Sequence, residues 1–436
     1  MLYLIYLIFI FQRLKRWLNF YQEHEYDSSR FLVWWIKRKL FDKRATILLV
    51  LVFLLNLLNR WLALSFGSLG FIILAFLEPK TKNNKKPLVF TARAKRIFIL
   101  SFLLIIAFSV LLKEIWYLIL IVQLLPVFVV FANLILWPFE KIIQNYYLAN
   151  AKKILKKYQP IVIGITGSYG KTTTKYILGQ ILNAYQPTLW TSGGINTLMG
   201  ITKVIRQELK PEHKYFVVEM GAYKIGSIKK LCDFVKPQHG IITSVGLAHF
   251  ERFKSAENIK KAKQELFESL PQNGIAVTGQ DSAIIVAKKL GVPELTIQAA
   301  LRHLQMPAHR LEIKKINDLV IIDDSYNSNP IGFQNALSLL NKQRGRKILV
   351  TPGMVELGAK SEEEHKKISQ IIAKTCDYVI LVNKKTTKYL QKYLKDFYLF
   401  SSLKQAQEFV NNLAKPGDAI LYENDLPDIY DEKIIF

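Results

Sequence analysis

The fold of most of the chain is indicated by residues 160–174, which read PIVIGITGSYGKTTT and are followed by the helical pattern KYILGQIL. An apolar strand, a loop with two glycines and the start of a helix follow one another directly, which is the setting that a phosphate-binding loop requires. The stretch therefore predicts an α/β domain of the parallel-sheet, P-loop ATPase-like type, with its ligand loop directly after the first strand.

The residues of this loop supply the chemistry of phosphate binding. Gly167 and Gly170 let backbone N–H groups approach phosphate oxygens, the helix start adds its positive dipole, and Lys171 adds a full charge. The hydroxyl of Thr172 can hold Mg²⁺. The strict spacing G-x-x-x-x-G-K-[ST] is not met, because Ile165 stands where the first Gly would be. A glycine turn with an incidental Lys is the alternative, but the flanking strand and helix favour the phosphate loop.

Two further strands are expected to end in polar side chains. Residues 215–222 read YFVVEMGA, a buried strand ending at Glu219, and a carboxylate at that edge of an open α/β sheet points into the ligand crevice. Residues 241–245 read IITSV, and His249 follows this strand. A structural ion pair for Glu219 and a structural role for His249 are the alternatives.

A second α/β domain is expected to begin near Pro307. Residues 320–330 read VIIDDSYNSNP, a strand that ends in Asp323 and Asp324 before a polar turn and a helix start. Asp323 could instead simply cap that helix. Three more strands with intervening helices complete a smaller, Rossmann-like domain, at 347–351, 377–382 and 418–422.

Taken in order from residue 161 to the C-terminus, these motifs resemble the Mur ligase family of ATP-dependent amide-bond ligases. Within that family they are most similar to the branch that adds D-alanyl-D-alanine to the peptidoglycan stem peptide. The resemblance implies ATP and Mg²⁺ as cofactors. The nucleotide-binding residues that it implies are Gly167, Ser168, Gly170, Lys171, Thr172, Thr173, Arg310, Asp324 and Asn327. The implied catalytic residues are Lys171, Glu219, His249, Lys263 and Arg310, the metal ligands Thr172, Glu219, His249 and Lys263, and the substrate contacts Asn196, Ser325 and Asn329.

Some of these roles leave an ordinary alternative open. In several family members the Lys that matches Lys263 is carbamylated by CO₂, which turns a cation into an Mg²⁺-binding carbamate. A Lys on the surface of the helix expected at 259–270 is the alternative. Asn196 lies in the segment TSGGINT, where the family has a loop near the substrate, but an ordinary turn would read the same way.

The chain also departs from the family in three places. Membrane spans are expected in place of the family's N-terminal domain that grips the UDP-sugar. Arg310 follows Lys263 so closely that the central domain must be shortened. Gly279 stands where the family has an Asn that contacts adenine, and Gly353 stands where it has an Asp. The shortening puts adenine binding in doubt, while the phosphate and Mg²⁺ groups are all present.

Charge and hydropathy separate a first region from this body. The 436 residues carry a net charge of +26 and are 50% hydrophobic, a combination that is rare in soluble globular proteins. Residues 1–150 hold 19 Lys+Arg against 7 Asp+Glu, and six of the seven Trp. The basic residues flank apolar runs and form no separate basic domain, so nucleic acid is not expected as a partner.

The apolar runs predict an α-helical transmembrane region before the α/β body. They lie at 1–12, 46–59, 61–77, 97–112 and 115–137. The positive-inside rule places the basic loops 13–44 and 78–96 in the cytoplasm, so the chain crosses twice over 46–77 and turns near Asn59. Five spans with an outside N-terminus satisfy every loop. Residues 1–12 could pass for a signal peptide, but no small-residue cleavage site follows.

The expected organisation is a transmembrane region over 1–138, a basic helical connector over 139–159, a shortened central ATP-binding domain over 160–306 and a C-terminal domain over 307–436. The expected function is amide-bond formation through an acyl phosphate, by an enzyme in the inner cell membrane with its body in the cytoplasm. The expected partners are membrane lipid, a peptide or lipid-linked cell-wall precursor, and an amino acid or dipeptide. A membrane ATP-binding scaffold or regulator, and an amide ligase of another polymer pathway, stay open.

Overall fold

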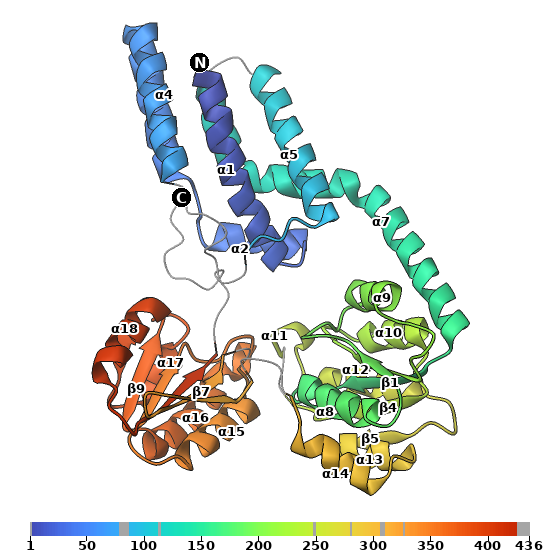
Figure 1. Ribbon diagram of the computed structural model, residues 1–436. Coiled ribbons are helices and arrows are strands. Elements are labelled where there is room, and N and C mark those ends of the chain that lie inside the picture. Colours follow the sequence, from blue (N-terminus) through green and yellow to red (C-terminus); the bar gives the residue numbers. More distant parts are fainter. Residues whose placement is uncertain are drawn as a thin grey trace. The chain divides into compact units, whose positions relative to one another are not determined.

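The chain is organised in two compact units. The structure is a computed structural model that describes residues 2–77, 87–111, 115–246, 250–279, 281–305, 310–325 and 328–424. Among the described residues, one unit is formed by the chain up to Ile143 and the other by the chain from Gln144 to Asn424. The boundary between them lies inside a single long helix, α7 (Leu125–Tyr158) (Figure 1).

The N-terminal unit is helical throughout the part that the structure describes. Besides the first half of α7 it contains α1 (Leu2–Glu23), α2 (Ser28–Lys37), α3 (Lys43–Leu58), α4 (Arg60–Phe76), α5 (Ala92–Leu111) and α6 (Ile115–Gln123). Its core holds an aromatic cluster in which the Phe71 ring lies 5.3 Å from that of Tyr6 and 5.4 Å from that of Phe9. The turn expected near Asn59 is confirmed, since the Asn59 side chain accepts from the first N–H groups of α4.

Two expectations for this unit were wrong. The stretch 13–44 is not a loop, because α1 continues to Glu23 and α2 follows. The apolar side chains of α1 beyond residue 12 are buried, and the buried Arg13 is neutralised by Asp42 at 3.1 Å. The run 115–137 is not one helix, because α6 ends at Gln123. Pro126 follows at the start of α7, where its missing N–H is tolerated.

Fewer helices than the five expected have the length and composition of a membrane span. Among the described residues, α5 and α7 are long and apolar enough to cross a bilayer, and α4 is a shorter apolar helix. The helix α3 has only 16 residues and begins with Lys43 and Arg44, and Arg13, Lys15 and Arg16 interrupt the apolar side of α1. Length and composition alone therefore support two spans.

The central domain of the second unit is built on a five-stranded, entirely parallel sheet in the order β2-β3-β1-β4-β5. The three strands expected from the sequence correspond to β1, β3 and β4, whereas β2 and β5 were not expected. The strands are β1 (Ile161–Thr166), β2 (Thr188–Trp190), β3 (Tyr215–Glu219), β4 (His239–Ile242) and β5 (Ala276–Thr278).

Helices cover both faces of the central sheet. Alternation along the strands directs Val162 and Phe216 to one core and Ile163 and Val217 to another. The first core also takes up Ala151, so the C-terminal part of α7 packs on this domain. The helices of the domain are α8 (Lys171–Asn183), α9 (Leu198–Gln207), α10 (Ser227–Val235), α11 (Phe250–Phe253), α12 (Ala256–Glu268), α13 (Ser282–Lys289) and α14 (Glu294–Arg302).

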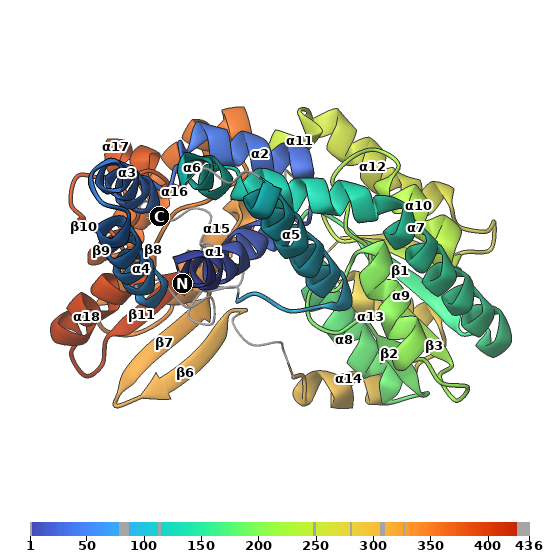
Figure 2. The ribbon, with the colours of Figure 1, turned by 90° about the horizontal axis from the view of Figure 1, so that it is seen from above.

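The C-terminal domain has a mixed six-stranded sheet in the order β10-β9-β8-β11-β7-β6. Only β6 runs antiparallel, and Figure 2 shows it as a hairpin with β7. The strands are β6 (Glu312–Ile316), β7 (Leu319–Asp324), β8 (Lys347–Thr351), β9 (Tyr378–Val382), β10 (Tyr398–Phe400) and β11 (Ala419–Glu423). The helices are α15 (Pro330–Asn341), the 3₁₀ turn η2 (Gly358–Lys360), α16 (Ser361–Thr375), α17 (Lys388–Tyr393) and α18 (Leu403–Leu413).

Candidate active site

The loop between β1 and α8 has the backbone that the sequence predicted. Gly167 has a φ of +154° and Gly170 a φ of +78°. A Cβ on Gly167 would lie 2.0 Å from Oγ1 of Thr243, so only glycine fits there. The loop is fastened to the end of β4, because the N–H of Ser168 donates to the carbonyl of Ser244 at 2.7 Å. The loop thus presents the N-terminus of α8, with Lys171, Thr172 and Thr173 in its first turn.

The Lys171 ammonium folds back over this loop. Its Nζ donates to the carbonyl oxygens of Gly167 at 2.9 Å and Ser168 at 3.2 Å. Burial lowers the pKa of Lys171 by more than the nearby Glu219 carboxylate raises it, and the charge of Arg310 lowers it further. A charge held in so costly a position favours an anionic ligand at the loop.

The Glu219 carboxylate is the centre of the site. It stands at the end of β3 with 2% of its side chain exposed, and its Oε2 accepts from Thr172 Oγ1 at 2.9 Å. The same oxygen lies 3.0 Å from Nζ of Lys175. Its Oε1 accepts from Asn196 Nδ2 at 3.1 Å. The structure therefore joins the expected metal ligands Thr172 and Glu219 to the expected substrate residue Asn196.

Lys175 is the residue of this centre that the sequence analysis missed. It follows Lys171 by one helical turn, so both project from the same face of α8. That four-residue spacing, read against a carboxylate at the end of β3, was the signal that could have found it. Lys263 is buried in α12, and the charge of Lys171 acts on it.

Burial lowers the pKa of Lys263 to about 7, and Lys171 adds to the shift. Its neighbour in α12, Glu265, has a structural role: its carboxylate accepts from the N–H groups of Gly226 and Lys229 and so caps α10. His249, expected as a further metal ligand, lies outside the described residues. Within the described ranges no three His, Cys, Asp or Glu side chains gather as metal ligands would.

Three expected residues of the C-terminal domain, Asp324, Ser325 and Asn329, lie at the end of β7 or in the segment that follows it. Asp324 accepts from the N–H of Leu311 at 3.1 Å, and burial raises its pKa. The Ser325 hydroxyl donates to Asp323 at 2.6 Å, and Asn329 caps α15 through the N–H of Gly332. The contacts of Ser325 and Asn329 are therefore local ones. Asn327 lies outside the described residues.

A second carboxylate lies beside Asp324 and was also missed. Glu423 at the end of β11 is in register with Asp324, is completely buried, and accepts from Ser328 Oγ at 2.6 Å. Burial raises the pKa of Glu423 well above its ordinary value, and Asp324 adds to that shift. Two adjacent strand ends thus bring together two acids that resist ionising at the same time.

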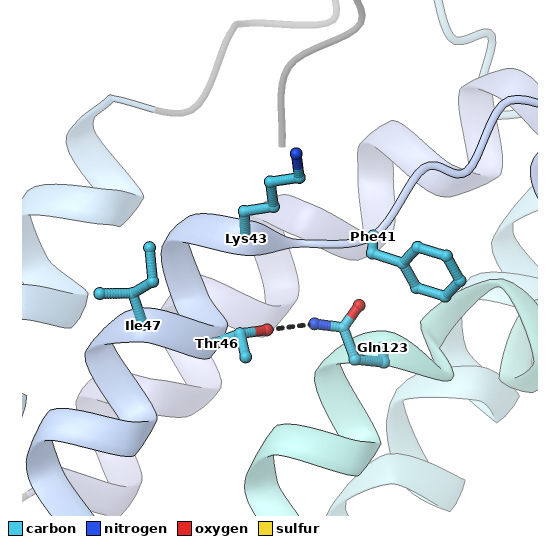
Figure 3. Close-up of a pocket in the computed structure, with 5 residues that line it drawn as sticks. All are labelled: Phe41, Lys43, Thr46, Ile47 and Gln123. Carbon is cyan, nitrogen blue, oxygen red and sulfur yellow. Dashed lines mark hydrogen bonds between the residues drawn. The ribbon is translucent and has the colours of Figure 1, made fainter.

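A cavity of about 380 Å³ lies elsewhere, between α3 and α6 of the N-terminal unit (Figure 3). Its lining is Phe41, Lys43, Thr46, Ile47 and Gln123, none of which is an expected site residue. The Gln123 amide is hydrogen-bonded to Thr46 and to the backbone of Asp42, so these groups are already satisfied. The lining therefore contains no residue of the phosphate loop or of the Glu219 centre.

Two family descriptions match consecutive parts of the chain. Residues 165–317 match the Mur ligase middle domain, and residues 309–422 match the Mur ligase, glutamate ligase domain. Among curated relatives, the UDP-N-acetylmuramoyl-tripeptide–D-alanyl-D-alanine ligase of Escherichia coli is 26% identical over 294 residues, which cover 52% of this chain and 65% of that protein. The ligase of the same name from Bacillus subtilis is 26% identical over 63% of this chain and 75% of its own length.

Solved structures agree on the fold. MurF from Acinetobacter baumannii superposes with a TM-score of 0.60 at 24% identity, covering 64% of this chain and 77% of that one. The ADP complex of MurF ligase from Thermotoga maritima gives 0.59 at 23% identity, covering 65% and 80%. The matched part of this chain spans somewhat less than two thirds of the E. coli ligase. Through its two consecutive α/β domains, over residues 165–422, the chain belongs to the Mur ligase family.

Proposed function

We propose that this protein is a membrane-bound, ATP-dependent amide-bond ligase of peptidoglycan precursor synthesis. It would join D-alanyl-D-alanine or a related amine to the carboxylate of a stem peptide. The observation that carries the proposal is the meeting of Thr172 Oγ1 with the Glu219 carboxylate at 2.9 Å, directly after the Lys171 loop. A loop that binds an anion without a metal would not need a carboxylate at this place.

The residues present suit Mg²⁺ and a nucleotide. A hydroxyl and a carboxylate are the oxygen ligands that Mg²⁺ takes from proteins beside nucleotide phosphates. The positive φ of Gly167 and Gly170 gives the loop its turn before the N-terminus of α8, and Lys171 supplies a buried charge. Thr172 and Glu219 would hold the metal, with His249 and a carbamylated Lys263 as further proposed ligands. The metal would neutralise charge on the phosphates.

The reaction would follow from these positions in two steps. The acceptor carboxylate attacks the γ-phosphorus of ATP, the bond to the β-phosphate oxygen breaks, and ADP leaves with an acyl phosphate formed. The amine then attacks the acyl carbon, phosphate leaves with the electrons of the C–O bond, and the amine proton passes to a base. Lys171 and Arg310 would hold the transferring phosphoryl group, while Asp324 and Asn327 would bind the nucleotide from the C-terminal domain.

Lys263 suits the carbamate proposed for it. CO₂ reacts with a neutral amine to give a carbamate and a proton. A pKa lowered to about 7 leaves a large share of this amine neutral near physiological pH, whereas an ordinary lysine is almost fully protonated. Its burial in α12 shields the product from solvent.

Membrane attachment is proposed from the surface of the N-terminal unit. Most of the large hydrophobic side chains that are exposed in this structure belong to its helices, for example Leu58, Trp61 and Phe76. Apolar surface of that extent is a feature of proteins that face lipid. We propose that the ligase body lies in the cytoplasm. A lipid-linked or membrane-presented peptide and a UDP-linked tripeptide are the two candidate acceptors.

A non-catalytic ATP-binding scaffold is the second candidate. It is favoured by Gly279 and Gly353, which stand where the resembled family has an Asn near adenine and an Asp. The two candidates differ in turnover, because a scaffold binds ATP without substrate-dependent release of ADP.

The test uses the full chain, purified in detergent, with D-alanyl-D-alanine and either UDP-linked or lipid-linked tripeptide. A ligase releases ADP and phosphate only when both substrates are present. With ¹⁸O in the acceptor carboxylate, one label must appear in the phosphate, which is the signature of an acyl phosphate. Lys171→Ala should abolish release, while the exposed Lys203→Ala serves as the matched control. ATP binding without release under every substrate combination would reject the ligase.

A further inference from the structure

The ammonium of Lys175 is buried in an unusual place for a positive charge. Its side chain is 0% exposed and lies beside the carboxylate that we assign to the metal, with Nζ 3.0 Å from Glu219 Oε2. The same Nζ donates to the carbonyl of Gly193 at 2.5 Å. One side chain of α8 is therefore bonded to the end of β3 and to the loop that follows β2.

Lys175 and the metal site share one oxygen atom. Oε2 of Glu219 accepts from Lys175 Nζ and from Thr172 Oγ1, and Thr172 is the other proposed metal ligand. A buried carboxylate without a counter-charge is costly, so a cation must stand beside it when no metal is present. Lys175 meets that need in this structure.

We propose that Lys175 is a positioning residue with two linked tasks. Its ammonium is the counter-cation of Glu219 while the metal is absent, and its bond to Gly193 ties the loop 191–197 to that carboxylate. The inference rests on the proposed function only in taking Glu219 as a metal ligand. A metal ion then has to compete with Lys175 for Oε2 of Glu219. The competition also affects Asn196, because its amide donates to Oε1 of the same carboxylate.

The competition has a definite sign. A divalent ion at Glu219 is repelled by a fixed positive charge that bonds to the same oxygen, and the repulsion is strong where water is excluded. Removing the ammonium removes this repulsion and leaves a carboxylate that seeks a cation. Loss of Lys175 should therefore tighten metal binding and reduce the hydrogen-exchange protection of the loop. Damage to the fold would instead weaken metal binding as well.

The first measurement is Mn²⁺ binding to the full chain in detergent without nucleotide, followed by the EPR signal of the free ion. Lys175→Met should lower the Kd for Mn²⁺ at least tenfold, and Lys175→Arg, which keeps the charge, should stay within threefold of the wild type. Lys175→Gln, which also removes the charge, is the second variant in case the methionine protein does not fold. Lys203→Gln, on the exposed side of α9, is the matched control.

The second measurement is hydrogen exchange of peptides that cover residues 191–197 in the metal-free protein. Exchange there should be at least fivefold faster in Lys175→Met and Lys175→Gln than in the wild type, with unchanged exchange in β4. If a variant keeps the wild-type melting temperature and binds Mn²⁺ no more tightly, Lys175 is not the counter-cation of Glu219. If hydrogen exchange of residues 191–197 is unchanged, Lys175 does not tie this loop to the carboxylate. Neither readout needs turnover, so absence of ligase activity would reject the proposed function without deciding this inference.

Discussion

At the scale of single residues, the site depends on charges that are placed where burial opposes them. Lys171, Lys175 and Lys263 all have a lowered pKa, and burial is the main cause for each. Asp324 and Glu423 have a raised pKa for the same reason. Of these groups, Asp324 and Glu423 end parallel strands, and Lys175 lies beside Glu219 at the end of another. Shifted groups in such places indicate a site for charged ligands.

We predict that turnover depends on CO₂ through Lys263. Its amine, with a pKa of about 7, is about one tenth neutral at pH 6 and about nine tenths neutral at pH 8, so carbamate formation should rise over this range. ADP release in CO₂-free buffer at pH 8 should fall at least tenfold and recover when bicarbonate is added. Lys263→Arg should be slow in both buffers. A ¹³C signal from ¹³CO₂ in the wild type, absent in this variant, would identify the carbamate, and equal rates in both buffers would refute it.

We predict that Glu423→Gln stabilises the C-terminal domain at neutral pH. The pKa of Glu423 is raised above its ordinary value of 4.5, so the folded state holds a proton that the unfolded state releases. Folding free energy is therefore lost as pH rises from about 4.5 towards the raised pKa. The variant should show no gain at pH 4 and a higher melting temperature at pH 7.5, by about 3 °C for each pKa unit of the shift.

The matched control for this prediction is Glu408→Gln, because Glu408 is 63% exposed in α18. Its melting temperature should follow the wild type at every pH. A difference between Glu423→Gln and the wild type that does not change from pH 4 to pH 8 would mean that the Glu423 carboxylate ionises normally in the folded protein.

At the scale of elements, α8 is the helix whose placement decides the site, because it carries Lys171, Thr172 and Lys175. Its position against β2 depends on Gly179, where an added Cβ would lie 2.7 Å from Cδ2 of Trp190. Glycine inside a helix normally costs stability, so close approach of the strand explains its presence here.

We predict that Gly179→Ala destabilises the central domain by about 1–3 kcal/mol, although alanine is the better helix former. The displaced α8 should also bind ADP more weakly. Trp190→Leu makes room at the same place, so the cost of the alanine should shrink in the double variant. Denaturant unfolding of the four proteins measures this coupling, and additive costs would show that Gly179 and Trp190 do not limit the packing of α8.

The elements that the sequence analysis found and those that it missed differ physically. Buried parallel strands such as β1 and β3 are continuous apolar runs that end in Thr166 and Glu219, and these could be predicted. The strands β2 and β10 have three residues each, and β6 is largely exposed, so they carry little pattern. Lys175 and Glu423 were missed because their roles arise from neighbours that are distant in sequence, Glu219 and Asp324.

At the scale of the whole molecule, the two units differ in how much apolar surface they expose. The second unit buries its large apolar side chains in four clusters around two sheets. The N-terminal unit has one core and still exposes apolar side chains along α3, α4 and α5. Such a surface is unfavourable in water and favourable against lipid. The net charge of +26 does not offset it, because most of the basic residues belong to the second unit.

We predict that the second unit can be produced without the N-terminal unit when the chain is cut before Gln144. The full chain should remain in the membrane pellet after carbonate washing and require detergent for release. A fragment from residue 144 to the C-terminus should stay in the soluble fraction, because α7 from Gln144 onward packs on the core of the central domain. It should bind ADP within about threefold of the full chain, since the loop, Lys171 and Glu219 all lie in the second unit. Lys171→Ala in both proteins is the control for binding at the loop. A full chain that is released by carbonate would remove the membrane from the proposed function and leave the ligase to be tested in solution.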